Sequence, residues 1–276
     1  MAKEKKRKQK KPKATMAEKA DKHILYEKAV QCVEAEIDFI DQTYLDLRGR
    51  RAISLREDFC GTANTSCEWI RRRKDNTAYC IDIDPDVLDW GRQHHIIKLK
   101  PQQAGRIHLI NDDVLKARTP LVDVVLAMNF SYWYLKNRRA MKQYYKKVYS
   151  ALADDGIFFL DAFGGYEAFR EMEESTKYNG FTYVWDQSRY NPITGDALMH
   201  IHFKFKDGSR LKKAFTYDWR QWTLPELTEM LSETGFKATV YWEGEDEDGE
   251  ANGVFSPAIE APADAGWVAY IVAEKK

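Results

Sequence analysis

The chain has 276 residues and no net charge, because 43 Lys or Arg residues balance 43 Asp or Glu residues. This length can bury the core of one domain, with or without an insertion, and the composition is that of a soluble globular protein. No apolar run reaches the roughly 18 residues that a membrane span requires, and the Lys-rich start lacks the apolar segment of a secretory signal. We therefore expect a cytoplasmic protein without a membrane partner.

Charge is distributed unevenly along the chain. Residues 1–23 carry ten Lys or Arg and three acids, a net charge of +7, so the remainder has a net charge of −7. A run as basic as residues 5–13 cannot bury apolar surface, and we expect residues 1–22 to be a disordered tail. Two interpretations remain open: a solubilising tail, or an anchor for RNA or another polyanion.

The predicted elements of the first half alternate between helix and strand. Residues 23–47 have apolar residues at helical spacing. Strands are predicted at 52–55, 77–83, 106–110, 122–128 and 156–162, and the intervening helices include 62–72, one opened by Asp84-Pro85, and 138–152. This alternation predicts an α/β fold with a doubly wound, mostly parallel sheet covered by helices on both faces.

The pattern changes after residue 165. Segments 181–190, 197–205 and 210–217 are separated by turns and predict an antiparallel meander, followed by a helix at 223–235 and strands at 238–242 and 267–272. We therefore interpret residues 23–276 as a single domain. It comprises a core (23–165), a β-meander insertion or lid (166–221), and a C-terminal helix and strands that complete the sheet (222–276).

Metal binding is not expected. The chain has four cysteines, Cys32, Cys60, Cys67 and Cys80. They form no Cys-x-x-Cys pair, so we expect reduced thiols rather than a zinc site. His200 and His202 share one face of a predicted strand, but the sequence offers no evident third ligand.

The segment 55–64, Leu-Arg-Glu-Asp-Phe-Cys-Gly-Thr-Ala-Asn, follows a short apolar strand and leads through a small-residue turn into a helix. This geometry lets backbone approach a nucleotide-like ligand closely. The segment resembles the acid-hydrophobe-Gly-x-Gly-x-Gly motif of class I S-adenosylmethionine (SAM) dependent methyltransferases, in a variant form typical of bacterial small-molecule enzymes. On that motif Glu57 is the acid and Cys60-Gly61-Thr62 the central segment, while Phe59 and Ala63 replace the outer glycines.

The resemblance implies a Rossmann-like fold, SAM as cofactor, and cofactor contacts from the five residues 57 and 59–62. Asp82 ends the second strand, where a carboxylate can accept hydrogen bonds from a ribose diol, and the resemblance gives it that role with Ile83 beside it. After the third strand, Asp113 and Val114 match the residues that contact adenine, with Asp112 a close rival.

Two further cofactor contacts are expected. The fourth strand ends in Asn129, where donor and acceptor should meet. Asn129–Tyr132 resembles the Asn-Pro-Pro-Tyr of methyltransferases that act on planar amines, but Phe130 and Ser131 replace both prolines, so that specificity does not transfer.

Related enzymes often fold an N-terminal helix over the cofactor, which would place the ring of Tyr26 near the sulfonium, an arrangement that cation–π attraction favours. Tyr26 as ordinary helix packing is the other interpretation.

The predicted function is SAM-dependent methyl transfer by in-line displacement, which requires alignment of the reactants but no universal catalytic residue. A small-molecule acceptor is favoured because aromatic residues such as Tyr183, Trp185 and Trp219 are concentrated in the insertion. The alternatives are an RNA- or ribosome-associated methyltransferase that uses the basic tail, and a non-catalytic SAM-binding scaffold. A nicotinamide oxidoreductase is disfavoured, because Phe59 would crowd a pyrophosphate at the helix terminus.

Overall fold

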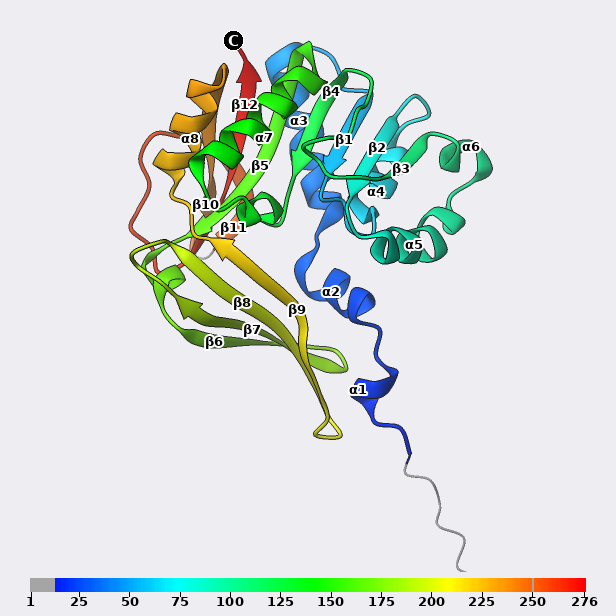
Figure 1. Ribbon diagram of the computed structural model, residues 1–276, viewed down its shortest axis with the longest axis vertical. Coiled ribbons are helices and arrows are strands. Elements are labelled where there is room, and N and C mark those ends of the chain that lie inside the picture. Colours follow the sequence, from blue (N-terminus) through cyan, green and yellow to red (C-terminus); the bar gives the residue numbers. More distant parts are fainter. Residues whose placement is uncertain (1–12, 250) are drawn as a thin grey trace, which may run out of the picture.

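The computed structural model describes residues 13–249 and 251–276 and contains two β-sheets (Figure 1). The larger sheet has the strands β1 (Ser54–Asp58), β2 (Thr77–Asp82), β3 (Ile107–Asn111), β4 (Val122–Ala127), β5 (Leu152–Gly164), β10 (Phe236–Glu245), β11 (Ala251–Ala258) and β12 (Trp267–Lys275). The smaller has β6 (Met172–Tyr178), β7 (Phe181–Tyr190), β8 (Asp196–Phe205) and β9 (Arg210–Arg220). The helices are α1 (Met16–Lys19), α2 (Lys22–Val30), α3 (Val33–Arg48), α4 (Asn64–Arg72), α5 (Pro85–His94), α6 (Pro101–Ala104), α7 (Arg138–Ala151) and α8 (Leu224–Glu233).

The larger sheet is doubly wound, which confirms the predicted α/β fold. Its strand order is β11-β10-β12-β5-β4-β1-β2-β3. β1 pairs in parallel with β2 on one side and with β4 on the other, so the winding direction reverses between them. Ligands of such sheets bind outside the carboxyl ends of the strands at this reversal. β12 lies antiparallel between β5 and β10, which makes the sheet mixed at that edge.

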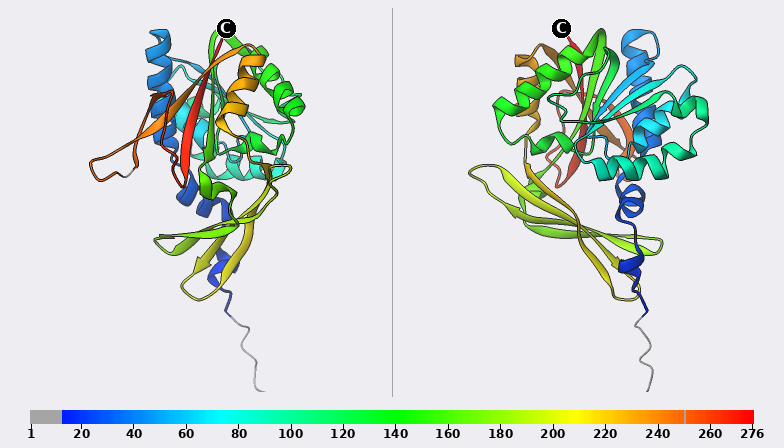
Figure 2. Two further views of the ribbon diagram at one scale, coloured as in Figure 1. Left: turned by 90° about the vertical axis from the view of Figure 1, so that its left-hand side faces the viewer. Right: turned by 45° about the vertical axis from the view of Figure 1, so that its right-hand side comes forward.

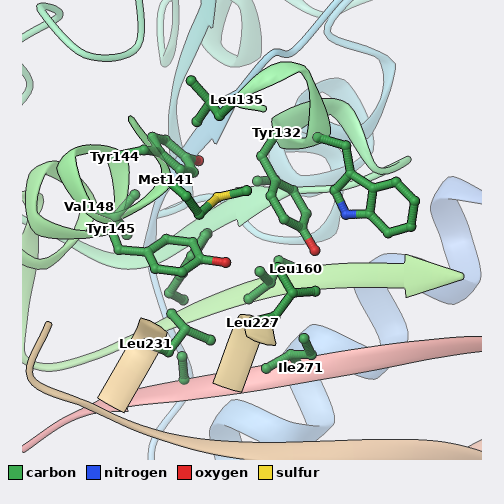
Figure 3. Close-up of a cluster of buried hydrophobic side chains, with 14 of the residues drawn as sticks. Tyr132, Leu135, Met141, Tyr144, Tyr145, Val148, Leu160, Leu227, Leu231 and Ile271 are labelled. Carbon is green, nitrogen blue, oxygen red and sulfur yellow. The ribbon is translucent and has the colours of Figure 1, made fainter. Parts of the chain in front are cut away.

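Helices cover both faces of the larger sheet (Figure 2). On one face α7 and α8 pack through apolar side chains such as Met141, Val148 and Leu231 (Figure 3). On the other face Ile37, Ile40 and Tyr44 of α3 pack beside residues of α4 and α5. The central strand β4 is buried at every position, as its apolar residues 124–127 predict. Asp123 interrupts this run, and its buried carboxylate accepts hydrogen bonds from the Arg50 guanidinium and the Ser54 backbone N–H. No helix in the described parts of the chain is long and apolar enough to cross a membrane.

The smaller sheet is antiparallel, in the order β6-β7-β8-β9, and faces the carboxyl ends of the parallel strands (Figure 1). The predicted meander corresponds to β7, β8 and β9. Sequence reasoning missed β6 and β11, because both are edge strands whose side chains are mostly exposed and therefore show no apolar alternation.

The N-terminal region differs from its prediction in two ways. The helix expected over 23–47 is two helices, because Gln31 and Cys32 leave helical geometry between α2 and α3. Residues 13–22, placed in the disordered tail by the sequence, include the short helix α1. The backbone N–H of Met16 donates to Asp207 at 2.8 Å, which attaches α1 to the β8–β9 hairpin. The remainder of the predicted tail, residues 1–12, lies outside the described residues.

Candidate active site

A cleft of about 600 Å³ opens at the carboxyl ends of β1, β2 and β4. Eight of the residues expected to contact the cofactor line it: Tyr26, Glu57, Phe59, Cys60, Gly61, Thr62, Asp82 and Asn129. The other three, Ile83, Asp113 and Val114, line an adjoining hollow of about 220 Å³ that shares Phe59 and Asp82 with the cleft. The structure therefore brings all eleven into one continuous region.

The loop between β1 and α4 has the backbone of a glycine-rich turn. Phe59, Gly61 and Ala63 have φ values of 57°, 53° and 56°, all in the left-handed region that favours glycine. Phe59 and Ala63 are the two positions where the sequence departs from the glycine motif. The departures thus change the side chains and add local strain, but they leave the course of the backbone unchanged.

Glu57 closes β1 and faces the first turn of α4. Its carboxylate accepts hydrogen bonds from the backbone N–H of Ser66, at 3.0 Å, and from the Ser66 hydroxyl. It thereby satisfies a helix N–H that has no partner within the helix. Burial raises the pKa of Glu57 to about 8, although both hydrogen bonds oppose the shift. Glu57 therefore helps to shape the loop as well as lining the cleft.

Asp82 ends β2 and lies directly beside that loop. Its two carboxylate oxygens accept the backbone N–H groups of Gly61 at 2.8 Å and of Asp84 at 2.9 Å. Burial raises the pKa of Asp82. Each oxygen retains acceptor capacity for a further donor, so the side chain is placed as a ribose diol requires. Asp84 caps α5 through the backbone N–H of Asp86, as its sequence position predicts.

The hollow next to Asp82 is formed by the loop after β3. The Asp112 carboxylate accepts the Asp113 backbone N–H at 2.8 Å, and the Asp113 carboxylate accepts the Leu115 N–H at 2.9 Å. Both acids therefore form local turns and both line the hollow. The fully buried Arg56 fixes this loop from behind, because its guanidinium donates to the Val114 carbonyl at 3.0 Å.

α2 lies over the cleft and is attached to it by polar contacts that the sequence did not reveal. The Glu27 carboxylate accepts the Thr62 hydroxyl at 2.9 Å and lies 2.6 Å from Nε2 of His95. At the start of α2, the Asp21 carboxylate accepts the Trp90 indole N–H at 2.8 Å. The signal available in the sequence was the cap at Asp21. Nothing in the sequence pointed to the pairing of Glu27 with His95.

A second cavity, of about 220 Å³, adjoins the cleft; we call it the aromatic pocket. It shares Tyr26, Asn129 and Tyr217 with the cleft, and its other aromatic walls are Phe130, Phe163, Tyr183, Trp185 and Trp219. The hydroxyls of Tyr26 and Tyr217 hydrogen-bond to each other, and burial raises the pKa of both phenols. The sequence had placed Tyr183, Trp185 and Trp219 in a lid, but gave no sign of Tyr217.

Asp161 supports the junction between the two cavities and was missed in the sequence. Its carboxylate accepts the backbone N–H groups of Asn129 at 2.7 Å and Phe130 at 2.9 Å. Both donors have φ near 57°, so the carboxylate stabilises a strained turn. Burial raises the pKa of Asp161 to about 7. The available signal was a single acid within the apolar run of residues 157–163.

The two histidines considered as metal ligands have other partners. Nδ1 of His200 lies 3.0 Å from the Thr216 hydroxyl, and Nε2 of His202 lies 3.0 Å from the Asp186 carboxylate. Nδ1 of His202 accepts the Lys213 backbone N–H at 2.7 Å. These contacts join β7, β8 and β9, so both histidines have structural roles within the smaller sheet.

No family model and no curated protein matches the sequence. Solved structures do match. A SAM-dependent methyltransferase from Clostridium acetobutylicum is 15% identical with a TM-score of 0.69, over 92% of this chain and 96% of that one. The amino pentose methyltransferase CalS10 from Micromonospora echinaspora, solved with SAM, is 14% identical with a TM-score of 0.66 and the same coverages. DesVI from Streptomyces venezuelae is 16% identical, with a TM-score of 0.65 over 92% and 96%.

The chain has the fold of the SAM-dependent methyltransferases. The match extends over nearly the whole length of both chains, so it includes the smaller sheet as well as the doubly wound core. The division of residues 23–276 into a core, a β-meander insertion or lid and a C-terminal part stays a prediction.

Proposed function

We propose that this protein is a SAM-dependent methyltransferase that acts on a small molecule in the cytoplasm. The observation that carries the proposal is the negative charge of the cleft next to residues 59–63, the loop between β1 and α4. Six of its lining residues are acids, Glu27, Glu57, Asp58, Asp82, Asp84 and Asp86. Burial raises the pKa of Glu57 to about 8 and Arg56 neutralises Asp58, so the negative charge comes from the other four. The basic side chains that line it, among the described residues, are Lys22 and His23. Such a cleft favours a ligand with a net positive charge.

This charge distinguishes between the two cofactors that a doubly wound fold commonly holds. A dinucleotide carries a pyrophosphate, which requires backbone N–H groups and positive charge at the helix terminus. Here the Ser66 N–H in the first turn of α4 already donates to the Glu57 carboxylate, and the Phe59 side chain lines the cleft. SAM has no phosphate and carries a sulfonium, so it fits the acidic cleft that a pyrophosphate would not.

The residues suggest a placement for each part of the cofactor. Asp82 would accept hydrogen bonds from the ribose hydroxyls, and the hollow between Ile83 and Val114 would hold the adenine. The opposite end of the cleft, at Tyr26 and Asn129, adjoins the aromatic pocket. A methyl group presented there would face an acceptor held in that pocket.

When bound, SAM supplies an activated methyl group. The protein's part is to align the acceptor with that group and to exclude water. α2 serves both purposes, because Glu27 and Asp21 attach it to Thr62 and Trp90 across the cleft. Tyr26 and Asn129 then define the path between the two cavities.

Calorimetry with SAM, S-adenosylhomocysteine and NADH tests the proposal. We expect the first two to bind and NADH not to bind. Asp82→Ala should weaken SAM binding by about 1.5–3 kcal/mol, because hydrogen bonds to a charged acceptor are lost. Asp89→Asn, at an exposed position of α5 paired with Arg92, is the matched control and should bind as wild type does. Binding of NADH without SAM would contradict the proposal.

A further inference from the structure

We propose that the methyl acceptor is a flat, uncharged aromatic amine, with its ring in the aromatic pocket and its nitrogen at the junction of Tyr26, Asn129 and Tyr217. The inference rests on the proposed function and specifies the substrate class of that site. Three features of the pocket lead to it: its aromatic walls, its lack of charge, and the protonation state of the two phenols at its mouth.

The walls present ring faces in orientations that suit a flat guest. Tyr217 and Trp219 of β9 stack with centroids 4.3 Å apart and planes inclined by 24°. Trp185 of β7 lies 6.1 Å from Tyr217, and Phe163 of β5 meets Trp185 edge-on at 6.3 Å and 86°. Aromatic pairs favour offset-stacked and edge-to-face contacts of this kind. A flat ring can therefore make both kinds of contact with these walls.

The aromatic pocket offers few partners for an acceptor that carries a charge or several hydroxyl groups. None of the described side chains that line the pocket is ionisable to an anion or cation at neutral pH, so a charged acceptor would lose hydration without gaining an ion pair. The hydroxyls of a sugar ring each require a partner. The polar side-chain groups available include the Asn129 amide and the phenols of Tyr26 and Tyr217, which already bond to each other.

The size of the pocket limits the guest further. Its volume of about 220 Å³ is below the roughly 300–1,000 Å³ that is usual for sites of drug-sized ligands. One or two fused rings would fill it. Part of a larger acceptor would have to extend out of the pocket past Val268, which is 39% exposed.

The junction residues favour nitrogen as the methylated atom. Burial raises the pKa of Tyr26 and of Tyr217, so both phenols remain protonated at neutral pH and serve as hydrogen-bond partners rather than as bases. A neutral amine needs no base before transfer. Its lone pair forms the C–N bond as the bond between sulfur and the methyl carbon breaks, which leaves a neutral thioether, and the resulting ammonium then loses its proton to water.

Binding of indole, choline and glucosamine in the presence of S-adenosylhomocysteine tests the ring and the charge separately. We expect indole to bind and the other two not to bind. Val268→Trp, at the exposed rim, should weaken indole binding at least tenfold, and so should Trp185→Ala, which removes a wall. Ile193→Trp, at a turn position that is 92% exposed, is the matched control and should leave indole binding unchanged.

Methyl transfer from radiolabelled SAM to 5-aminoindole and to 5-hydroxyindole then tests the atom, and we expect turnover of the amine only. Preference for choline, glucosamine or the hydroxyl compound, with normal S-adenosylhomocysteine affinity, would overturn the acceptor assignment and leave the proposed function in place. Failure of S-adenosylhomocysteine to bind wild type would overturn both.

Discussion

The cofactor cleft and the aromatic pocket adjoin at Tyr26, Asn129 and Tyr217, yet they are built in opposite ways. The cleft is formed by loops at strand ends, with left-handed residues and buried carboxylates such as Glu57. The pocket is formed largely by side chains on strand faces, with no charged lining residue among those described. Alternate side chains of a strand project from one face of the sheet and can be exchanged without moving the backbone. Substitutions in the aromatic pocket can therefore change the acceptor site while leaving the loops of the cofactor cleft in place.

The cleft also depends on a buried ion pair beneath it. Arg56 and Asp58 alternate with Glu57 along β1 and point to the face covered by α7, where the guanidinium Nε lies 2.7 Å from the Asp58 carboxylate. The Tyr144 hydroxyl donates to the same carboxylate at 3.0 Å. The aromatic pocket has no comparable pair among its lining residues. We therefore expect substitutions to affect the two regions by different mechanisms.

The largest effect is expected from Arg56→Ala. It leaves the Asp58 carboxylate buried without its cationic partner, which typically costs about 3–5 kcal/mol of unfolding free energy. Urea denaturation measures the loss. The double variant Arg56→Met/Asp58→Asn removes both charges and should recover most of it, because no unpaired charge stays buried and the new amide carbonyl at position 58 can still accept the Tyr144 hydroxyl. Equal destabilisation of the single and double variants would show that packing, not charge, dominates at this position.

Gly61→Val should impair binding in the cofactor cleft without affecting binding in the aromatic pocket. A Cβ at residue 61 has no protein atom within 4 Å, so a side chain there would strain the backbone at φ +53° but would project into open space at the cleft. We expect at least a hundredfold loss of SAM affinity, about 2.7 kcal/mol, and unchanged indole binding.

Gly208→Val is the matched control for that prediction. Residue 208 also has a positive φ, of 80°, and a Cβ there would have no protein atom within 4 Å, but it lies in the β8–β9 turn. The strain should lower stability in both variants. A similar loss of SAM affinity in Gly208→Val would show that strain, rather than occupation of the cleft, is responsible.

A smaller effect is expected from pH. Burial raises the pKa of Glu57 in the folded protein to about 8, from an unperturbed value of 4.5. Between these values the folded chain holds a proton that the unfolded chain has released, so stability should fall as pH rises from about 5 to 8. Urea denaturation of Glu57→Gln across this range should show a shallower decline than wild type. The exposed Glu229→Gln should retain the wild-type slope. A steeper decline in Glu57→Gln would contradict the assignment.

The sequence was sufficient for the parts of the molecule that follow local rules. Asp84 caps a helix, the apolar run of β4 is buried, and the glycine-like motif around Gly61 forms the expected turn. Contacts between distant segments were not predictable, because no local pattern encodes them. Glu27 meets His95 across 68 positions, and the Asp161 carboxylate meets the Asn129 backbone across 32.

The smallest effect on the two cavities is expected from deletion of residues 1–12. That segment carries seven Lys or Arg and one Glu, a net charge of +6. The proposed small-molecule acceptor lies in a pocket without charge, so the deletion should leave SAM affinity, melting temperature and turnover of 5-aminoindole unchanged. The cut stops before residue 13 because α1 bonds to the β8–β9 hairpin.

The same deletion tests the RNA interpretation of the basic segment. If six charges each contact a phosphate of single-stranded RNA, log K should fall with log salt at a slope of about −4 in the full-length protein. The deletion should abolish that slope. Salt-dependent RNA binding that disappears with the deletion, while turnover persists, would make the segment an anchor separate from catalysis. Loss of RNA binding and of methyl transfer together would mean that the acceptor is RNA, and the contrast between an acidic cleft and an uncharged acceptor pocket would then not describe the substrate.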